Sequence, residues 1–266
     1  MQKIYLLLPL LIAAIFAEAQ RNEFGFGYQL SKPQGNMKNG WDAGHGIQMQ
    51  YHRYLRDVKG LGFGVNFGYG NYAWERNPQQ YRFPNGSVTN TTAVLSSSLV
   101  SAGASVKIVP FVNKRFSPFA EIQAGIFGMV SSIYIEDPAD PLGCRALENR
   151  NLVSSSTFYQ AAGIGVQWQP GKSSSGSRHL IELSIKGVRG GDMEYANMKH
   201  VYDQHSQTSV QNPRQGSGER PLVVRFVNVQ TNEQHDHSVA EIYNHPLRMV
   251  QLNLQYSFRF SKIFNE

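Results

Sequence analysis

The sequence predicts an all-β protein, a closed eight-stranded antiparallel up-and-down transmembrane β-barrel with long extracellular loops. Three observations predict this fold. Apolar and polar residues alternate with a period of two through eight segments, which is the periodicity of strands and not of helices. The connections between the segments are alternately short and long. Charged residues inside the apolar segments fall on the polar face of the alternation.

The composition excludes several classes of protein. Only 17% of the 266 residues are charged and 41% are hydrophobic, which is incompatible with a disordered chain or a long coiled coil. No apolar run reaches about 18 residues, so membrane-spanning helices are not expected. The net charge of +6 is spread without a basic block, and nucleic acid is not an expected partner. The single cysteine, Cys144, cannot form an intramolecular disulfide.

The first 19 residues have the features of a secretory signal peptide. Lys3 precedes an apolar segment from Ile4 to Phe16, and Ala17-Glu18-Ala19 forms an A-x-A cleavage site before Gln20. The apolar segment is too short to span a bilayer. We therefore expect residues 1–19 to be removed on export and residues 20–266 to form the barrel domain.

The first four predicted strands each place apolar side chains on one face. In 24–30, aromatic residues and leucine alternate with Gly and Gln. In 44–55, Ile, Met and Tyr alternate with Gln and His. In 61–70, Leu, Phe, Val and Tyr alternate with Gly and Asn, and in 99–110, Val, Ala and Ile alternate with Ser, Gly and Lys. The glycines of 61–70 leave room for larger side chains from the opposite wall.

The last four predicted strands follow the same rule. In 118–134, Ala and Ile alternate with Glu, Gln and Gly. In 157–169, Ile, Val and Trp alternate with Gly and Gln. In 178–188, Ile and Leu alternate with Glu, Ser and Lys, and in 248–260, Leu, Tyr and Phe alternate with Asn, Gln, Ser and Arg.

The lengths of the connections distinguish a membrane barrel from a soluble sandwich, which would show the same alternation. The links after the second, fourth and sixth strands are short. The links after the first, third, fifth and seventh strands are long: 31–43, 73–98, 135–156 and 190–246. Short turns at one end, long loops at the other and an even number of strands are typical of an outer-membrane barrel.

The polar face of the strands predicts a charged and amide-rich lumen. Its expected members form a lumen polar network: Glu121, Gln123, Glu182, Lys186, Gln255 and Arg259, with Gln167 beside them. An eight-stranded barrel is just wide enough for side chains to fill it, so an open pore is not expected. These charges either pair to fix the register of the strands or form a gated path for protons or ions.

These features resemble the small OmpA/OmpX-type outer-membrane barrels. The resemblance rests on the Ala-Glu-Ala leader end before Gln20, the eight alternating strands and the aromatic last strand from Gln251 to Phe260. The Ala-Gln junction and the strands rich in Tyr, Asn and Gly are most similar to members from Bacteroidota. The resemblance implies a bacterial outer-membrane location, contact with outer-membrane lipid and a monomeric barrel.

The sequence shows no catalytic or cofactor signature. Some small barrels of this kind modify lipid A with His, Ser and acidic residues, but here His179 and Glu182 fall on opposite faces of one strand. The His235-Asp236-His237 triplet could hold a transition metal, or could belong to a solvated loop. We expect no catalytic residue, no cofactor and no metal site.

The longest connection, Gly190 to Pro246, is the expected partner-contact loop. It contains a β-prone stretch at 222–229, which could extend the barrel wall or pair with a partner strand. The candidate contact residues are Val223, Val224, Arg225, Phe226, Val227, His235 and His237. The expected function is non-enzymatic: a structural or binding module that meets an extracellular ligand or an envelope protein through its loops. The alternatives are an accessory subunit of a secretion or assembly machine and a lipid A-modifying enzyme.

Aromatic residues near the predicted strand ends suggest girdles at the two membrane interfaces. The residues concerned are Trp41, Tyr69, Tyr72, Trp74, Trp168 and Phe258.

Overall fold

The computed structural model describes most of the chain as strands. The described residues are 21–56, 58–82, 86, 88–112, 114–136, 146–171, 177–197, 220–227 and 234–261, and the predicted signal peptide lies outside them. The elements are β1 (Arg21–Pro33), η1 (Gly35–Asn39, a 3-10 helix), β2 (Gly44–Tyr54), β3 (Leu61–Arg82), β4 (Val88–Ile108), β5 (Phe116–Glu136), β6 (Ala146–Trp168), β7 (Ser177–Asn197), β8 (Arg220–Val227) and β9 (Gln234–Ser261). Among the described residues, no helix is long and apolar enough to cross a membrane.

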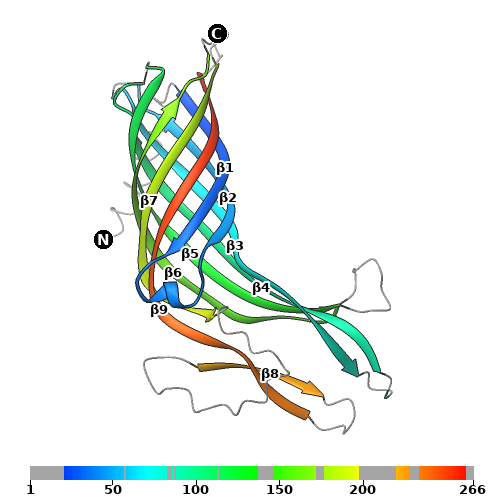
Figure 1. The fold of residues 1–266 in the computed structure, drawn as a ribbon. Helices are drawn as coiled ribbons and strands as arrows, with labels where there is room; N and C mark the ends of the chain where they lie inside the picture. The colour runs from blue at the N-terminus through cyan, green and yellow to red at the C-terminus, as the bar shows by residue number, and fades with distance from the viewer. Residues whose placement is uncertain are drawn as a thin grey trace, which may run out of the picture.

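Eight of these strands close into a barrel (Figure 1). Neighbours along the chain pair antiparallel from β1 to β7, β7 pairs with β9, and β9 pairs with β1 from Arg21↔Ser261 to Pro33↔Met249. Closure gives the wall strands a hydrogen-bonding neighbour on both sides, which a lipid environment requires. The predicted fold class is confirmed.

The two ends of the barrel differ. The turns after β2, β4 and β6 lie at the end where β1 begins and β9 finishes. At the other end, β3, β4, β5 and β6 continue beyond the barrel as long hairpins (Figure 1). The sequence predicted this sorting of the connections, and by analogy with outer-membrane barrels the hairpin end is the extracellular one.

The segments 73–98 and 135–156 were predicted to be loops. This prediction was wrong, because most of their residues form strands. β3 and β4 stay paired out to Arg82↔Val88, and β5 and β6 out to Glu136↔Ala146. Both hairpins extend beyond the end of the barrel (Figure 1). A hairpin without a membrane face loses the apolar alternation on which strand prediction depends.

The predicted loop from Gly190 to Pro246 also contains strands. β7 continues to Asn197, β9 begins at Gln234, and β8 pairs with the first part of β9 from Val227↔Gln234 to Arg220↔Ile242. β8 lies outside the closed barrel, at the far edge of the sheet (Figure 1). The β-prone stretch therefore extends the wall as one strand of an additional hairpin.

The outer wall of the barrel is apolar. Ile126 is 63% exposed and Phe158 66% exposed. On the inward face of the wall, Gln123 of β5 and Gln255 of β9 are buried. The exposed outer row includes Phe26, Tyr28, Ile47, Met49, Val65, Phe67, Ile122, Ile164, Leu183, Ile185, Leu252 and Leu254. Large apolar side chains pointing outward around a polar interior make this wall complementary to hydrocarbon.

Inward-facing glycines make space in the narrow lumen. A Cβ at Gly64 would lie 2.1 Å from the Tyr51 carbonyl oxygen and 2.6 Å from Cδ2 of His52. His52 is fully buried and can occupy the lumen only because the neighbouring position on β3 has no side chain.

Candidate functional site

One ion-pair cluster in the lumen joins strands β1, β4, β7 and β9. The ammonium of Lys107 donates to Glu23 Oε1 at 2.8 Å and to Glu182 Oε2 at 2.7 Å. Arg259 Nε donates to Glu23 Oε2 at 2.9 Å. The hydroxyl of Tyr54 donates to the same Glu23 carboxylate at 3.1 Å. Both oxygens of Glu23 are therefore occupied, and with Tyr54 of β2 the cluster fixes five strands in register.

A second cluster forms around Glu121 on β5. Lys186 Nζ lies 3.0 Å from Glu121 Oε2. Gln123 donates to Glu121 Oε1 at 2.8 Å, and Nε2 of His52 lies 3.6 Å from the same oxygen. Nε2 of His52 is also 2.9 Å from the hydroxyl of Ser105.

Amide side chains extend the first cluster. Glu182 accepts from Gln50 at 3.2 Å and from Gln167 at 2.9 Å, and Gln167 accepts from Arg259 at 3.2 Å. Among the buried side chains of the described residues, three carboxylates (Glu23, Glu121 and Glu182) face three permanent cations (Lys107, Lys186 and Arg259). The charges balance, which buried ions require because an unpaired one has a high desolvation cost.

The structure brings the predicted lumen residues together in part. Glu182 and Arg259 join the Glu23–Lys107 cluster, while Glu121, Gln123 and Lys186 form the other cluster. Gln255 is buried in the same lumen as the cross-strand partner of Glu182, and its amide donates to the hydroxyl of Ser257 at 3.3 Å.

Sequence reasoning missed four central members: Glu23, His52, Tyr54 and Lys107. Lys107 and His52 fall on the polar faces of the predicted strands 99–110 and 44–55, so their positions alone could have indicated them. Glu23 lies one residue before the predicted start of the first strand, and β1 begins at Arg21. Tyr54 lies two residues after His52, so the alternation with a period of two places it on the inward face, although it is aromatic.

His52, Ser105 and Glu121 do not form a catalytic relay. Ser105 and Glu121 both approach Nε2 of His52, and the Nδ1 atom is buried without a hydrogen-bond partner. A relay needs the base and the orienting carboxylate on different ring nitrogens. His179, which is exposed on the outer wall and stacks on Tyr256, is remote from this group.

An apolar plug fills the lumen at the hairpin end. It is built from η1, the turn after it and the inward faces of the wall strands. Its members are Met37, Trp41, Tyr72, Leu99, Phe127, Met129, Tyr159, Ala161, Val188, Met193, Tyr195, Tyr243, Leu247 and Met249. The interfacial position expected for Trp41 and Tyr72 was wrong: both are buried in this plug, with ring centroids 5.1 Å apart.

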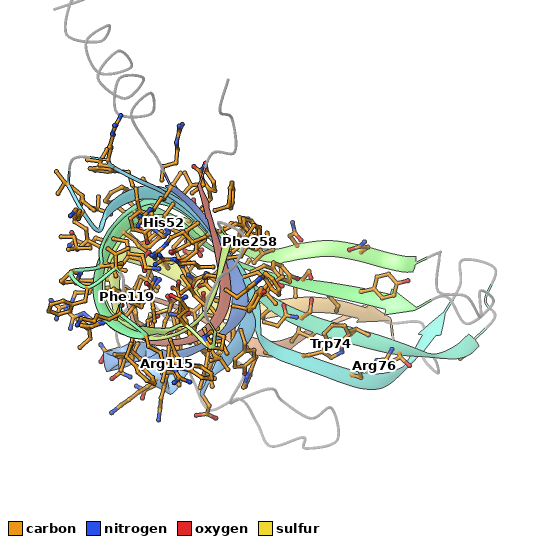
Figure 2. All side chains as sticks on the ribbon, turned by 90° about the horizontal axis from the view of Figure 1, so that it is seen from above. His52, Trp74, Arg76, Arg115, Phe119 and Phe258 are labelled. Atoms are coloured by element: carbon orange, nitrogen blue, oxygen red, sulfur yellow. The ribbon has the colours of Figure 1, made fainter. Side chains whose placement is uncertain are left out.

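The plug and the polar layers close the barrel. Between them, a cavity of about 10 Å³ remains beside Gln48, Asn66 and Gln251. This volume is near the minimum for one water molecule. Figure 2, seen along the barrel, shows His52 and Phe119 inside the ring of strands and Trp74 and Arg76 on a hairpin that extends away from it.

The predicted partner-contact residues lie in one hairpin. Val223 to Val227 are in β8 and His235 and His237 in β9, where Val224 pairs with His237 and Phe226 with His235. The backbone of these residues is described, and their side chains lie outside the described part. The structure thus places all seven in a two-stranded extension at the hairpin end.

A closed wall, an outward apolar belt and a filled polar interior identify the environment of this chain. It is an outer-membrane β-barrel.

Several solved outer-membrane proteins are similar to this chain. OprG from Pseudomonas aeruginosa matches 92% of this chain and 98% of its own, with 8% identity and a TM-score of 0.43. Neisserial surface protein A matches 91% and 97%, with 9% identity and a TM-score of 0.40. Ail, the attachment invasion locus protein of Yersinia pestis, matches 91% and 99%, with 12% identity and a TM-score of 0.37. No protein-family model and no curated sequence matches the chain.

Proposed function

We propose that this barrel is a non-enzymatic binding module that recognises an extracellular ligand or an envelope protein through its extended hairpins. The observation that carries the proposal is the β8–β9 hairpin, built on a barrel whose described interior is filled. A rigid scaffold with a filled interior and a long hairpin at one end is suited to recognition.

The edge of β8 supports one mode of recognition. β8 is the last strand of the sheet and pairs with β9 on one side, and no described strand pairs with its other side. An open edge has unpaired backbone N–H and C=O groups, to which an extended segment of a partner can add as a further strand. In this mode, backbone hydrogen bonds supply affinity and the side chains of β8 supply selectivity.

The experiment removes the hairpin without touching the barrel. Asn197 and Glu241 are cross-strand partners, so residues 198–240 can be replaced by a two-residue Asn-Gly turn that keeps every β7–β9 pair of the wall. The control shortens the β3–β4 hairpin by joining Arg76 to Val94, which are also cross-strand partners. Each variant is crosslinked in intact cells, and partners are identified by mass spectrometry.

The proposal requires a partner that the intact protein and the β3–β4 control recover and the 198–240 variant loses. Both variants must still shift in mobility when heated in SDS, which reports a folded barrel. If every partner survives removal of 198–240, the binding surface lies elsewhere. A partner retained through the outer wall or the short turns would instead support the accessory-subunit alternative.

The non-enzymatic part of the proposal rests on the lumen geometry. Ser105, His52 and Glu121 lie together in the described interior and are buried. Ser105 and Glu121 both approach Nε2 of His52, whereas a catalytic relay needs them on different ring nitrogens. Hydrolysis or acyl transfer on lipid A by the purified barrel, lost on changing one His or Ser, would contradict it.

A further inference from the structure

Three basic side chains lie together on the outer wall at the hairpin end. Arg189 on β7 and Arg248 on β9 are direct cross-strand partners, and Lys32 on β1 pairs with Val250, two residues along β9. All three are exposed and continue the outward-facing rows of their strands. Directly opposed residues have Cβ atoms about 5 Å apart and diagonal ones about 7–8 Å, so one phosphate group can reach all three.

These cations have no partner among the described residues. Neither guanidinium forms an ion pair or a side-chain hydrogen bond there, and the ammonium of Lys32 forms none. Like charges placed directly opposite each other on a sheet repel and destabilise it. The positive charges of Arg189 and Arg248 therefore have no neutralising anion among the described residues. We expect the anion to come from outside them.

The level of the cluster matches the outer edge of the membrane. The outward row of β9 is apolar from Phe260 to Val250, which are ten positions apart, and Arg248 is the next residue of that row. With a rise of about 3.3 Å per residue and a tilt of about 40°, this separation corresponds to about 25 Å along the barrel axis. That distance is the height of the apolar band of an outer-membrane barrel, so the three cations lie where lipid phosphates are.

A hollow in the outer wall begins at the same residue. It has a volume of about 970 Å³, and Arg189 and Gly187 line it on β7. The row of cross-strand neighbours from Arg189 passes through Gln160, Ala124 and Ala104 to Val65, and it descends towards the short-turn end of the barrel. A Cβ added at Gly187 would meet only Ala162 oxygen, at 4.0 Å. Small outward residues thus leave an oblique apolar channel below the cations.

From these observations we infer that the outer wall holds a specific site for a phosphate-bearing lipid of the outer leaflet. The phosphate lies between Arg189, Arg248 and Lys32, and an acyl chain lies in the hollow over Gly187, Ala124 and Ala104. Charge complementarity selects the headgroup, and the absence of large side chains accommodates the chain. This site is separate from the β8–β9 hairpin and does not depend on the proposed function.

The test compares two lipids that differ only in phosphate. The full-length protein, extracted in detergent and stripped of lipid, is titrated with bisphosphorylated lipid A or with the same lipid A after enzymatic dephosphorylation, and bound lipid is measured by native mass spectrometry. We expect the phosphorylated form to bind at least about tenfold more tightly, since each basic residue near a lipid phosphate contributes on the order of 1 kcal/mol. Equal binding of the two forms would overturn the site.

Matched variants locate the site. R189Q/R248Q should lose the phosphate preference, while R56Q/K59Q, which removes the same charge from the exposed turn after β2, should keep it. G187F, which fills the hollow, should weaken binding of both forms of lipid A. A phosphate preference that survives in R189Q/R248Q would overturn the assignment.

Two further measurements keep the result interpretable. Inorganic phosphate at 10-fold excess over lipid A should not displace the lipid. Displacement would show a site for free anions and would overturn a lipid site. Because R189Q removes like-charge repulsion, its heat-modification midpoint in lipid-free zwitterionic detergent should be equal to or above that of the unaltered protein. A lower midpoint would mean that the two arginines already have a partner within the chain.

Discussion

Lys107 is the residue on which the polar lumen depends most. Its ammonium lies between Glu23 and Glu182, and all three side chains are almost completely buried. Removing it leaves two buried carboxylates with one cation fewer. In a low-dielectric interior the penalty for such a loss exceeds the value of the ion pair itself.

We predict that Lys107→Met lowers the free energy of unfolding by about 3–5 kcal/mol. The measurement is urea unfolding of the barrel refolded into lipid vesicles, followed by the loss of heat-modifiable protein. Adding Glu182→Gln to Lys107→Met removes one unpaired charge and should recover part of the loss. A single variant as stable as the unaltered barrel would show that the cluster does not stabilise the fold.

At the scale of the element, the strands that cross the membrane and the hairpins that leave it differ in what the sequence reveals. The alternation of apolar and polar residues predicted which face of β5, β7 and β9 turns outward. It did not predict that β3 and β4 continue to Arg82 and Val88, because no lipid selects apolar residues there. Nor could it predict the plug. A buried tryptophan such as Trp41 and a tryptophan at the membrane interface are the same residue type, and only their tertiary contacts distinguish them.

The orientation of β7 can be tested on one face of one strand. Leu183 is 48% exposed in the middle of the apolar belt, and His179 is exposed near its short-turn edge. Leu183→Arg should lower stability by about 2–4 kcal/mol and His179→Arg by about 0–1 kcal/mol, because the penalty for arginine falls with distance from the bilayer centre. Urea titration in vesicles measures both. Equal losses would mean that the strand is shifted in depth or in register.

The extended hairpins should open more readily than the wall. Pairs such as Arg76↔Val94 lie beyond the closed sheet, whereas Val65↔Ala104 lies within it. Amide groups in an extension with few buried contacts exchange through local opening, while wall amides exchange only when the barrel opens. In hydrogen–deuterium exchange of the bilayer-inserted protein, we expect the extension amides to exchange at least about a hundredfold faster. Equal protection would show that the hairpins are packed as firmly as the barrel.

At the scale of the whole molecule, three layers follow one another along the described lumen: an ion-pair layer, a belt of amides and an apolar plug. A cavity of about 10 Å³ lies in the belt, beside Gln48, Asn66 and Gln251. The outer wall is apolar and the interior is filled with packed side chains, so the proposed recognition uses the surfaces at the hairpin end and the outer wall.

Solute permeation tests this account most directly. The protein is reconstituted into liposomes loaded with a large polymer, and swelling in isotonic arabinose is followed by light scattering, with a porin as the positive control. A barrel closed by these layers should swell its liposomes at the rate of protein-free vesicles, and removal of the β8–β9 hairpin by the 198–240 variant should not change that rate. Rapid swelling by the intact, heat-modifiable protein would show that the lumen conducts, and would contradict a barrel that acts only through its surfaces.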